Sequence, residues 1–147
     1  MLAPISNPSE IQSISSACQT AGQKAFSGTQ EHLQTAIALL AKKPTADYRN
    51  SIKESISAIE SLSKQLTGEE GGGLDRALGK LDATVKFHGA FKAALLSLYG
   101  YTSDDDGIRH AILAEPQVGF DEAKFMLVTC SALVNFMIMK AEKAGLI

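Results

Sequence analysis

One long stretch of the chain, from Phe125 through Met139, is rich in apolar residues and carries no charged side chain. These fifteen residues include three polar ones, and they fall short of the roughly twenty that a helix needs to cross a bilayer. We therefore predict a central helix of a folded domain, from about 120 to 144, with no membrane contact. Because this helix is apolar nearly all round, other helices of the bundle or a second copy of the chain must cover it. The second alternative predicts a homodimer.

Apolar residues recur at every third or fourth position along most of the remaining chain, which is the period of an amphipathic helix. The clearest case predicts a long helix that ends at Gly68. Its apolar positions are Tyr48, Ile52, Ile56, Ile59, Leu62 and Leu66. A first helix is predicted from Pro8, with Ser9 as its cap and inward positions Ile11, Ile14, Cys18 and Ala21. A break at Gly28 then lets Thr29 cap a second helix, which ends before Lys42, Lys43 and Pro44. The apolar positions on one face of this helix are Leu33, Ile37 and Leu40.

Two more helices are expected before the last one. Leu74, Leu78 and Leu81 predict a short helix, and a further helix runs from about Ala90 to Tyr99 with Phe91, Leu95 and Leu98 inward. With 147 residues the chain has the length of one domain, 1–147. The fold class predicted from these patterns is an all-α bundle of about five to six helices with a long apolar C-terminal helix.

Charge and cysteine content limit the function classes. The chain has 14 basic and 16 acidic residues and a net charge of -2, so any nucleic-acid site must be local. Cys18 and Cys130 lie in apolar helical stretches, where free thiols commonly behave as small buried hydrophobes. The first residues lack the basic start and apolar run of a secretory signal, so we predict a cytoplasmic protein without a disulfide.

Several chemistries are excluded by spacing. The glycines of 68–73 lack the Gly-Lys-Ser/Thr ending of a nucleotide-binding loop. The three consecutive acids of 104–106 lack the spacing of an EF-hand, and the three histidines are far apart, so no metal or other cofactor is expected. No glycine elbow surrounds a serine, which argues against a hydrolase triad.

The segment 99–110 is the densest in reactive side chains, and we predict a polar turn there. Its three consecutive acids, which favour the start of a short helix, are Asp104, Asp105 and Asp106. In such a helix Asp105 would pair with Arg109, and Asp106 would pair with His110, each four residues later. Alternatively, Arg109 can brace a phosphate while His110 moves a proton near neutral pH, a combination able to cleave RNA without metal.

Three stretches, 47–60, 98–111 and 122–130, resemble the C-terminal domain of bacterial abortive-infection proteins, which is similar to the HEPN superfamily. The resemblance runs from about Pro4 to the end of the chain. It implies an all-helical bundle that pairs into a dimer and, in active members, an arginine with a histidine four to six residues later that cuts RNA. It also implies that the chain is the C-terminal part of a longer protein, because related chains often carry an extra N-terminal domain.

In this comparison Arg109 matches the arginine and His110 matches the polar residue after it. The positions for the later histidine hold Ala114, Glu115 and Pro116, so His110 itself or His88 would have to replace it. The predicted catalytic residues are accordingly Arg109 and His110. The residues predicted to support them are Tyr101, Asp104, Asp105 and Asp106. The predicted RNA-binding and phosphate-binding residues, on one side of the third helix, are Arg49, Asn50 and Lys53.

Two functions remain open. The first is an HEPN-like domain of a phage-defence protein that binds or cleaves RNA through Arg109 and His110. The second is a non-catalytic dimerisation or sensing module that controls a missing effector domain, with the same two residues in buried or interfacial polar contacts.

Overall fold

The computed structural model describes residues 5–68, 74–103 and 118–147. In these ranges the chain forms six α-helices and no β-strand, which confirms the predicted all-α bundle with a long apolar C-terminal helix. The helices are α1 (Pro8–Gln23), α2 (Ser27–Leu40), α3 (Tyr48–Thr67), α4 (Leu74–Asp82), α5 (Gly89–Ser103) and α7 (Phe120–Lys143).

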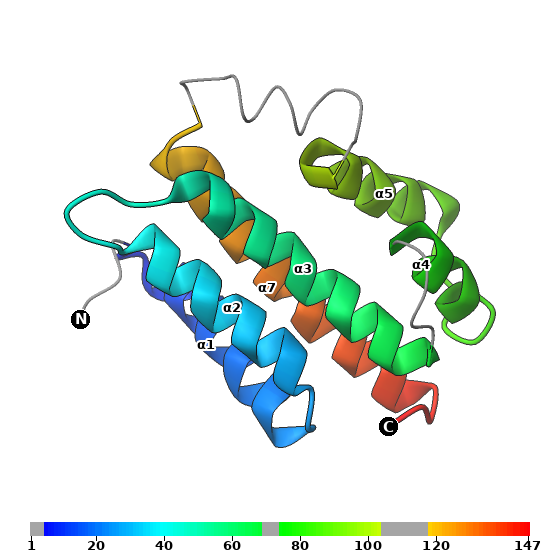
Figure 1. Cartoon of the computed structure of the whole chain (residues 1–147). Helices are drawn as coiled ribbons and strands as arrows, with labels where there is room; N and C mark the ends of the chain where they lie inside the picture. Colours follow the sequence, from blue (N-terminus) through cyan, green and yellow to red (C-terminus); the bar gives the residue numbers. More distant parts are fainter. Residues whose placement is uncertain (1–4, 69–73, 104–117) are drawn as a thin grey trace.

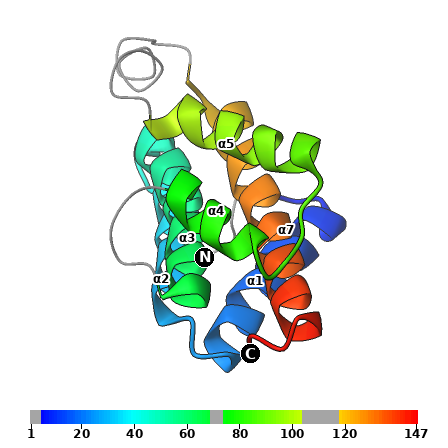
Figure 2. The same ribbon diagram turned by 90° about the vertical axis from the view of Figure 1, so that its right-hand side faces the viewer.

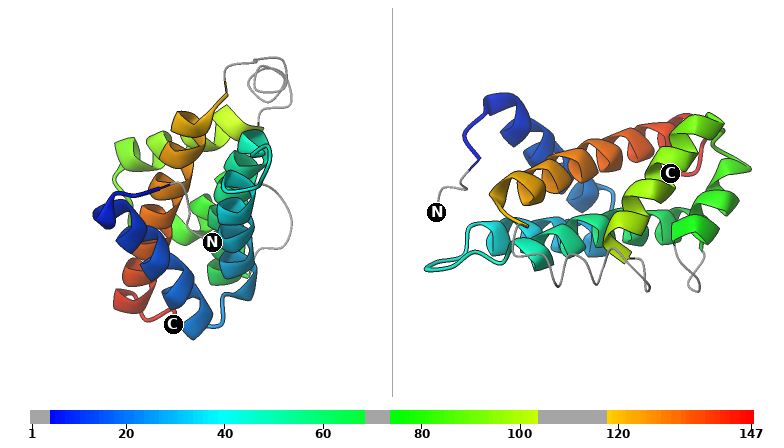
Figure 3. Two further views of the ribbon diagram at one scale, coloured as in Figure 1. Left: turned by 90° about the vertical axis from the view of Figure 1, so that its left-hand side faces the viewer. Right: turned by 90° about the horizontal axis from the view of Figure 1, so that it is seen from above.

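The core of the bundle has two layers (Figures 1 and 3). Helices α2 and α3 lie side by side in one layer, and α1 and α7 form the layer behind them. Helices α4 and α5 pack against the side of α3 that is remote from α2, as Figure 2 shows from that side. Helix α3 therefore packs against α2, α4, α5 and α7, and it forms the centre of the fold.

Helix α3 has the predicted bounds and the predicted inward face. Its largest fully buried side chains are Ile52, Ile59 and Leu62. The helix ends where Gly68 adopts the left-handed conformation, with φ of 69°, and donates its N–H to the Lys64 carbonyl. Glycine suits this place because the left-handed region costs it no side-chain clash.

Helix α7 also follows the prediction, beginning at Phe120 and ending next to Ala144. One face packs against α1, α2 and α3, with Met126, Leu127 and Val134 among its fully buried residues. Within the described ranges, α7 is also the one helix long and apolar enough, by length and composition, to cross a membrane. However, 44% of its apolar 18-residue stretch is buried in the bundle. A core helix of a water-soluble protein meets the same criteria.

Helix α1 begins at Pro8 as predicted, but its predicted cap was wrong by two residues. Asn7, not Ser9, is the cap: its side-chain oxygen accepts hydrogen bonds from the N–H groups of Ser9 and Glu10, at 2.9 and 3.3 Å. Pro8 then occupies the first helical position, which its fixed φ suits. Ile11, expected inward, is 42% exposed, because the buried stripe of α1 is narrow and consists of Ile14, Ala17 and Ala21.

The predicted start of α2 was also wrong. The helix begins at Ser27, so Gly28 and Thr29 lie inside its first turn. Thr29 is fully buried, and its hydroxyl donates to the Ala58 carbonyl of α3 at 3.4 Å rather than capping α2. A side chain at Gly28 would lie 2.6 Å from the Ser61 hydroxyl, so this glycine allows α2 to approach α3 closely instead of interrupting the helix.

Helix α5 is longer than predicted. It continues from Tyr99 through Ser103, so the first part of the predicted polar turn is helical. No charged residue or proline interrupts the chain between Tyr99 and Ser103, which lets the helical hydrogen bonds continue.

At the other end of α5, the rings of Phe87, Phe91 and Phe136 form a cluster that joins α5 to α7. The ring centroids of Phe91 and Phe136 are 5.0 Å apart.

Candidate functional site

The predicted catalytic pair, Arg109 and His110, lies outside the described residues. The same holds for the three acids predicted to support the pair, Asp104, Asp105 and Asp106, so the pairing of Asp105 with Arg109 and of Asp106 with His110 stays a prediction. The structure does place the two helices that flank this segment, because α5 ends at Ser103 and α7 begins at Phe120. The candidate site is therefore built from these two helix ends and from the side chains that lie beside them.

The first residues of α3 and α7 are in contact. The rings of Tyr48 and Phe120 meet edge to face, with centroids 6.4 Å apart and planes inclined by 70°. Both side chains are half-buried against the core. The start of α3, which carries the predicted phosphate-binding residues, thus lies at the same end of the bundle as the start of α7.

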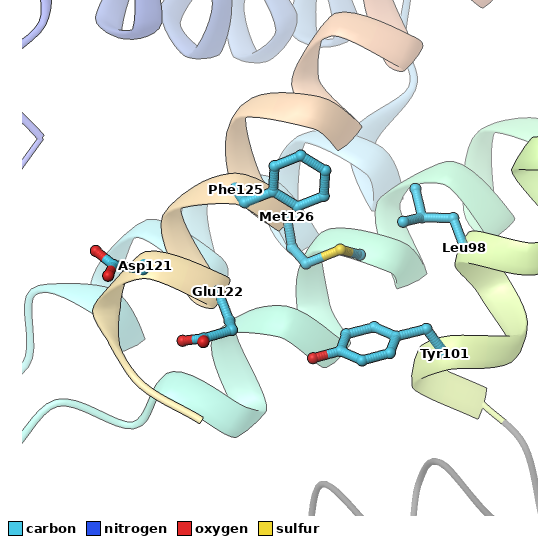
Figure 4. Close-up of a pocket in the computed structure, with 6 residues that line it drawn as sticks. All are labelled: Leu98, Tyr101, Asp121, Glu122, Phe125 and Met126. Carbon is cyan, nitrogen blue, oxygen red and sulfur yellow. The ribbon is translucent and has the colours of Figure 1, made fainter. Parts of the chain in front are cut away.

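A cavity of about 380 Å³ lies between the last turn of α5 and the first turns of α7 (Figure 4). Its lining residues are Leu98, Tyr101, Asp121, Glu122, Phe125 and Met126. The walls are mostly apolar, and the Phe125 ring is 59% exposed. Tyr101, predicted to support the catalytic pair, lies here in the last turn of α5, and its hydroxyl points toward α7 (Figure 4).

Glu122 has a structural role at the edge of this cavity. Its carboxylate accepts a hydrogen bond from the Gly119 N–H at 2.9 Å, which satisfies a free donor at the start of α7. This bond lowers the pKa of Glu122 below its ordinary value. The carboxylate therefore keeps its negative charge at neutral pH, where it also stabilises the positive end of the helix.

Two of the three predicted phosphate-binding residues are exposed cations. Arg49 and Lys53 lie one turn apart on α3, so their side chains share one face. Neither forms an ion pair with any residue in the described ranges. Both charges are therefore available to a phosphate group in solvent.

The third residue, Asn50, is already engaged. Its backbone N–H and its side-chain amide donate to the Asp47 carboxylate, at 3.1 and 2.8 Å. These bonds lower the pKa of Asp47, the side-chain bond more than the backbone bond, and the positive charges of Lys42 and Arg49 lower it further. Asp47 is thus an ionised cap that fixes the start of α3.

Sequence reasoning missed Lys42 and Lys43 as functional residues and used them only to end α2. Both are exposed in the connection between α2 and α3. The segment 42–53 holds four basic residues and one acidic residue, although the whole chain has a net charge of -2. Counting charge in short windows, rather than over whole helices, would have found this local excess.

The described histidines lie elsewhere. The His32 and Glu54 side chains pair across α2 and α3, with Nδ1 and Oε2 2.5 Å apart. His88, considered as a replacement imidazole, accepts a hydrogen bond from the Ala90 N–H at 3.1 Å and lies just before α5. The length of α5, about 20 Å, therefore separates His88 from Ser103.

The described part of the chain contains no cluster of three side chains able to hold a metal ion. Both cysteines are free thiols. Burial raises the pKa of Cys130 to about 12 and raises that of the half-buried Cys18 as well. A thiol of such high pKa is a poor nucleophile, so Cys130 serves the core.

No protein-family model, curated protein or solved structure matches the chain.

Proposed function

We propose that this chain is an HEPN-like, RNA-binding domain of a bacterial abortive-infection protein, with Arg109 and His110 as an RNA-cleaving pair. The observation that supports it best is the pair of exposed cations, Arg49 and Lys53, in the first two turns of α3, a helix whose first residue contacts the first residue of α7. The segment that carries Arg109 and His110 connects α5 to α7, so it joins the bundle at the same end.

The proposed chemistry needs no metal. The Arg109 guanidinium would hold a phosphate of the RNA backbone, and His110 would take or give the proton during cleavage. The three neighbouring carboxylates, which would favour the protonated imidazole, are Asp104, Asp105 and Asp106. Arg49 and Lys53 would bind neighbouring phosphates of the same strand, and Asn50 keeps one amide hydrogen for them after its bond to Asp47.

RNA degradation by the purified protein in the presence of a chelator tests this function. The proposal predicts cleavage without added metal, and loss of cleavage in Arg109→Ala with an unchanged far-ultraviolet circular dichroism spectrum. The control is Lys143→Gln, which removes an exposed cation at the C-terminal end of α7, about 35 Å along the helix from its start. Unchanged cleavage by Arg109→Ala would rule this site out.

A second candidate is a non-catalytic dimerisation or sensing module, and the exposed side of α7 favours it. Phe125 and Met139 are 59% and 55% exposed, and Ala132 and the half-covered Phe136 lie between them. Their spacing of seven, four and three residues places them on one stripe of the helix. Exposed apolar stripes of this kind often mark the contact with a second protein chain.

Sedimentation of the wild type beside two double variants separates the candidates. If the domain is a dimerisation module, the wild type sediments as a dimer, and Phe125→Ser with Met139→Ser produces monomers. Replacing Arg109 and His110 by alanine would then lower dimerisation or thermal stability without any RNA phenotype. A monomeric wild type that binds RNA would contradict this second candidate.

A further inference from the structure

A second, smaller cavity lies in the connection between α2 and α3. Its volume is about 190 Å³, and Lys42, Lys43, Pro44, Ala46 and Tyr48 contribute to its walls. Unlike the cavity beside α5, this one is mostly polar.

The walls of this pocket are held by the core. The Asp47 N–H donates to the Leu39 carbonyl at 2.9 Å, and the Ala41 N–H donates to the Ile37 carbonyl at 3.1 Å. Tyr48 is fixed on the other side by its ring contact with Phe120. These contacts hold both ends of the segment 41–48, which lines the pocket.

The charges around the pocket favour an anion. Within the described ranges, neither Lys42 nor Lys43 forms an ion pair. The positive charges of Arg49 and Lys42 both lower the pKa of the Asp47 carboxylate. Both oxygens of that carboxylate are bonded to Asn50, and Asp47 is the one acidic residue of the segment 42–53.

We infer that this pocket binds a phosphate monoester, with the Lys42 and Lys43 ammonium groups as its counter-charges. A phosphate monoester carries about -1.5 to -2 charges at pH 7 and offers three acceptor oxygens to the two lysines. A phosphodiester inside an RNA strand carries only one negative charge. The volume suits a phosphate group rather than a whole nucleotide, because complete ligands occupy pockets of roughly 300–1,000 Å³.

We assign this phosphate to the end of an RNA strand whose internal phosphates bind Arg49 and Lys53. This assignment rests on the proposed function. A free phosphorylated small molecule has the same chemistry. The experiment therefore has one arm without RNA and one arm with it.

In the first arm, methyl phosphate and dimethyl phosphate are titrated into the full chain and followed by amide chemical shifts. Methyl phosphate is expected to shift the amides of Ala46 and Tyr48, and dimethyl phosphate is expected to bind more weakly. Lys42→Gln and Lys43→Gln should each weaken methyl phosphate binding by about threefold, as expected for an exposed ion pair. Lys143→Gln, the matched control, should leave it unchanged.

In the second arm, short RNAs with a 5′-phosphate or a 5′-hydroxyl are compared. The inference predicts tighter binding of the phosphorylated strand by the wild type and equal binding of both strands by the Lys42→Gln, Lys43→Gln double variant. Methyl phosphate binding without RNA binding would support the pocket and contradict the RNA function. RNA binding without end preference, together with no response to methyl phosphate, would overturn the pocket and leave the RNA function standing.

Discussion

Both oxygens of the Asp47 carboxylate are bonded to Asn50. Oδ1 accepts from the Asn50 backbone N–H at 3.1 Å, and Oδ2 accepts from its side-chain amide at 2.8 Å. This double contact closes the first turn of α3 and fixes where the helix starts. The exposed side chains of Arg49 and Lys53 follow in the first two turns of the same helix, so the structural cap and the candidate binding surface lie next to each other.

The Asp47 cap should make stability depend on pH. Its pKa is lower in the folded chain than in the unfolded one, so the ionised carboxylate stabilises the fold at neutral pH. That contribution is lost as the pH falls through the folded pKa. Asp47→Asn keeps a capping oxygen without the charge. Its free energy of unfolding, measured with urea, should therefore decline less than that of the wild type below about pH 4. Parallel declines would contradict this assignment.

The contact between Tyr48 and Phe120 should couple α3 to α7 energetically. Phe120→Ala and Tyr48→Ala each remove an edge-to-face ring pair and part of the apolar cover of the core. In a double-mutant cycle followed by guanidinium unfolding, we expect a coupling free energy of about 0.5–1.5 kcal/mol. Additive effects of the two substitutions would show that the rings contribute only through their separate burial.

Two glycines provide a matched pair for backbone effects. Gly68 has a φ of 69°, and Gly79 lies within α4; a side-chain carbon at either would meet no atom within 4 Å. Gly68→Ala should destabilise the fold by about 1 kcal/mol because alanine disfavours the left-handed region. Gly79→Ala should stabilise it by about 0.5–1 kcal/mol because alanine is the better helix former. Thermal unfolding of both variants checks the opposite signs.

The two thiols should react at very different rates. Cys130 is fully buried with a pKa of about 12, whereas Cys18 is half-buried. A thiol reagent at about pH 8 attacks the thiolate, so the native protein should be labelled at Cys18 first and at Cys130 only when the bundle opens. Mass spectrometry of the labelled peptides with and without denaturant measures this order. Fast labelling of Cys130 in the native state would mean that α7 is not packed as described.

Helical periodicity was sufficient to predict the central elements of the fold. The bounds of α3 and α7 follow from regular apolar spacing, and their burial against each other agrees with it. The helix starts were less predictable, because several polar residues near each start can serve as caps. Asn7 rather than Ser9 caps α1. Thr29, which was predicted to cap α2, instead bonds to α3 through its hydroxyl.

The candidate site was only partly readable from the sequence. The shared face of Arg49 and Lys53 follows from their spacing, because residues four apart on a helix are neighbours. The contact between Tyr48 and Phe120 joins residues far apart in the chain, and no local pattern indicates it. The lysine pair of 42–43 was missed because two lysines before a proline are also the ordinary end of a helix.

The salt dependence of RNA binding tests the central claim most directly. The affinity of the full chain for a short single-stranded RNA is measured at several salt concentrations, for the wild type, for Arg49→Ala with Lys53→Ala, and for Lys143→Gln. If Arg49 and Lys53 each meet one phosphate, the slope of log K against log salt should be shallower in the double variant by about 1.4 and unchanged in Lys143→Gln. Equal slopes for the wild type and the double variant would contradict an RNA-binding face on α3.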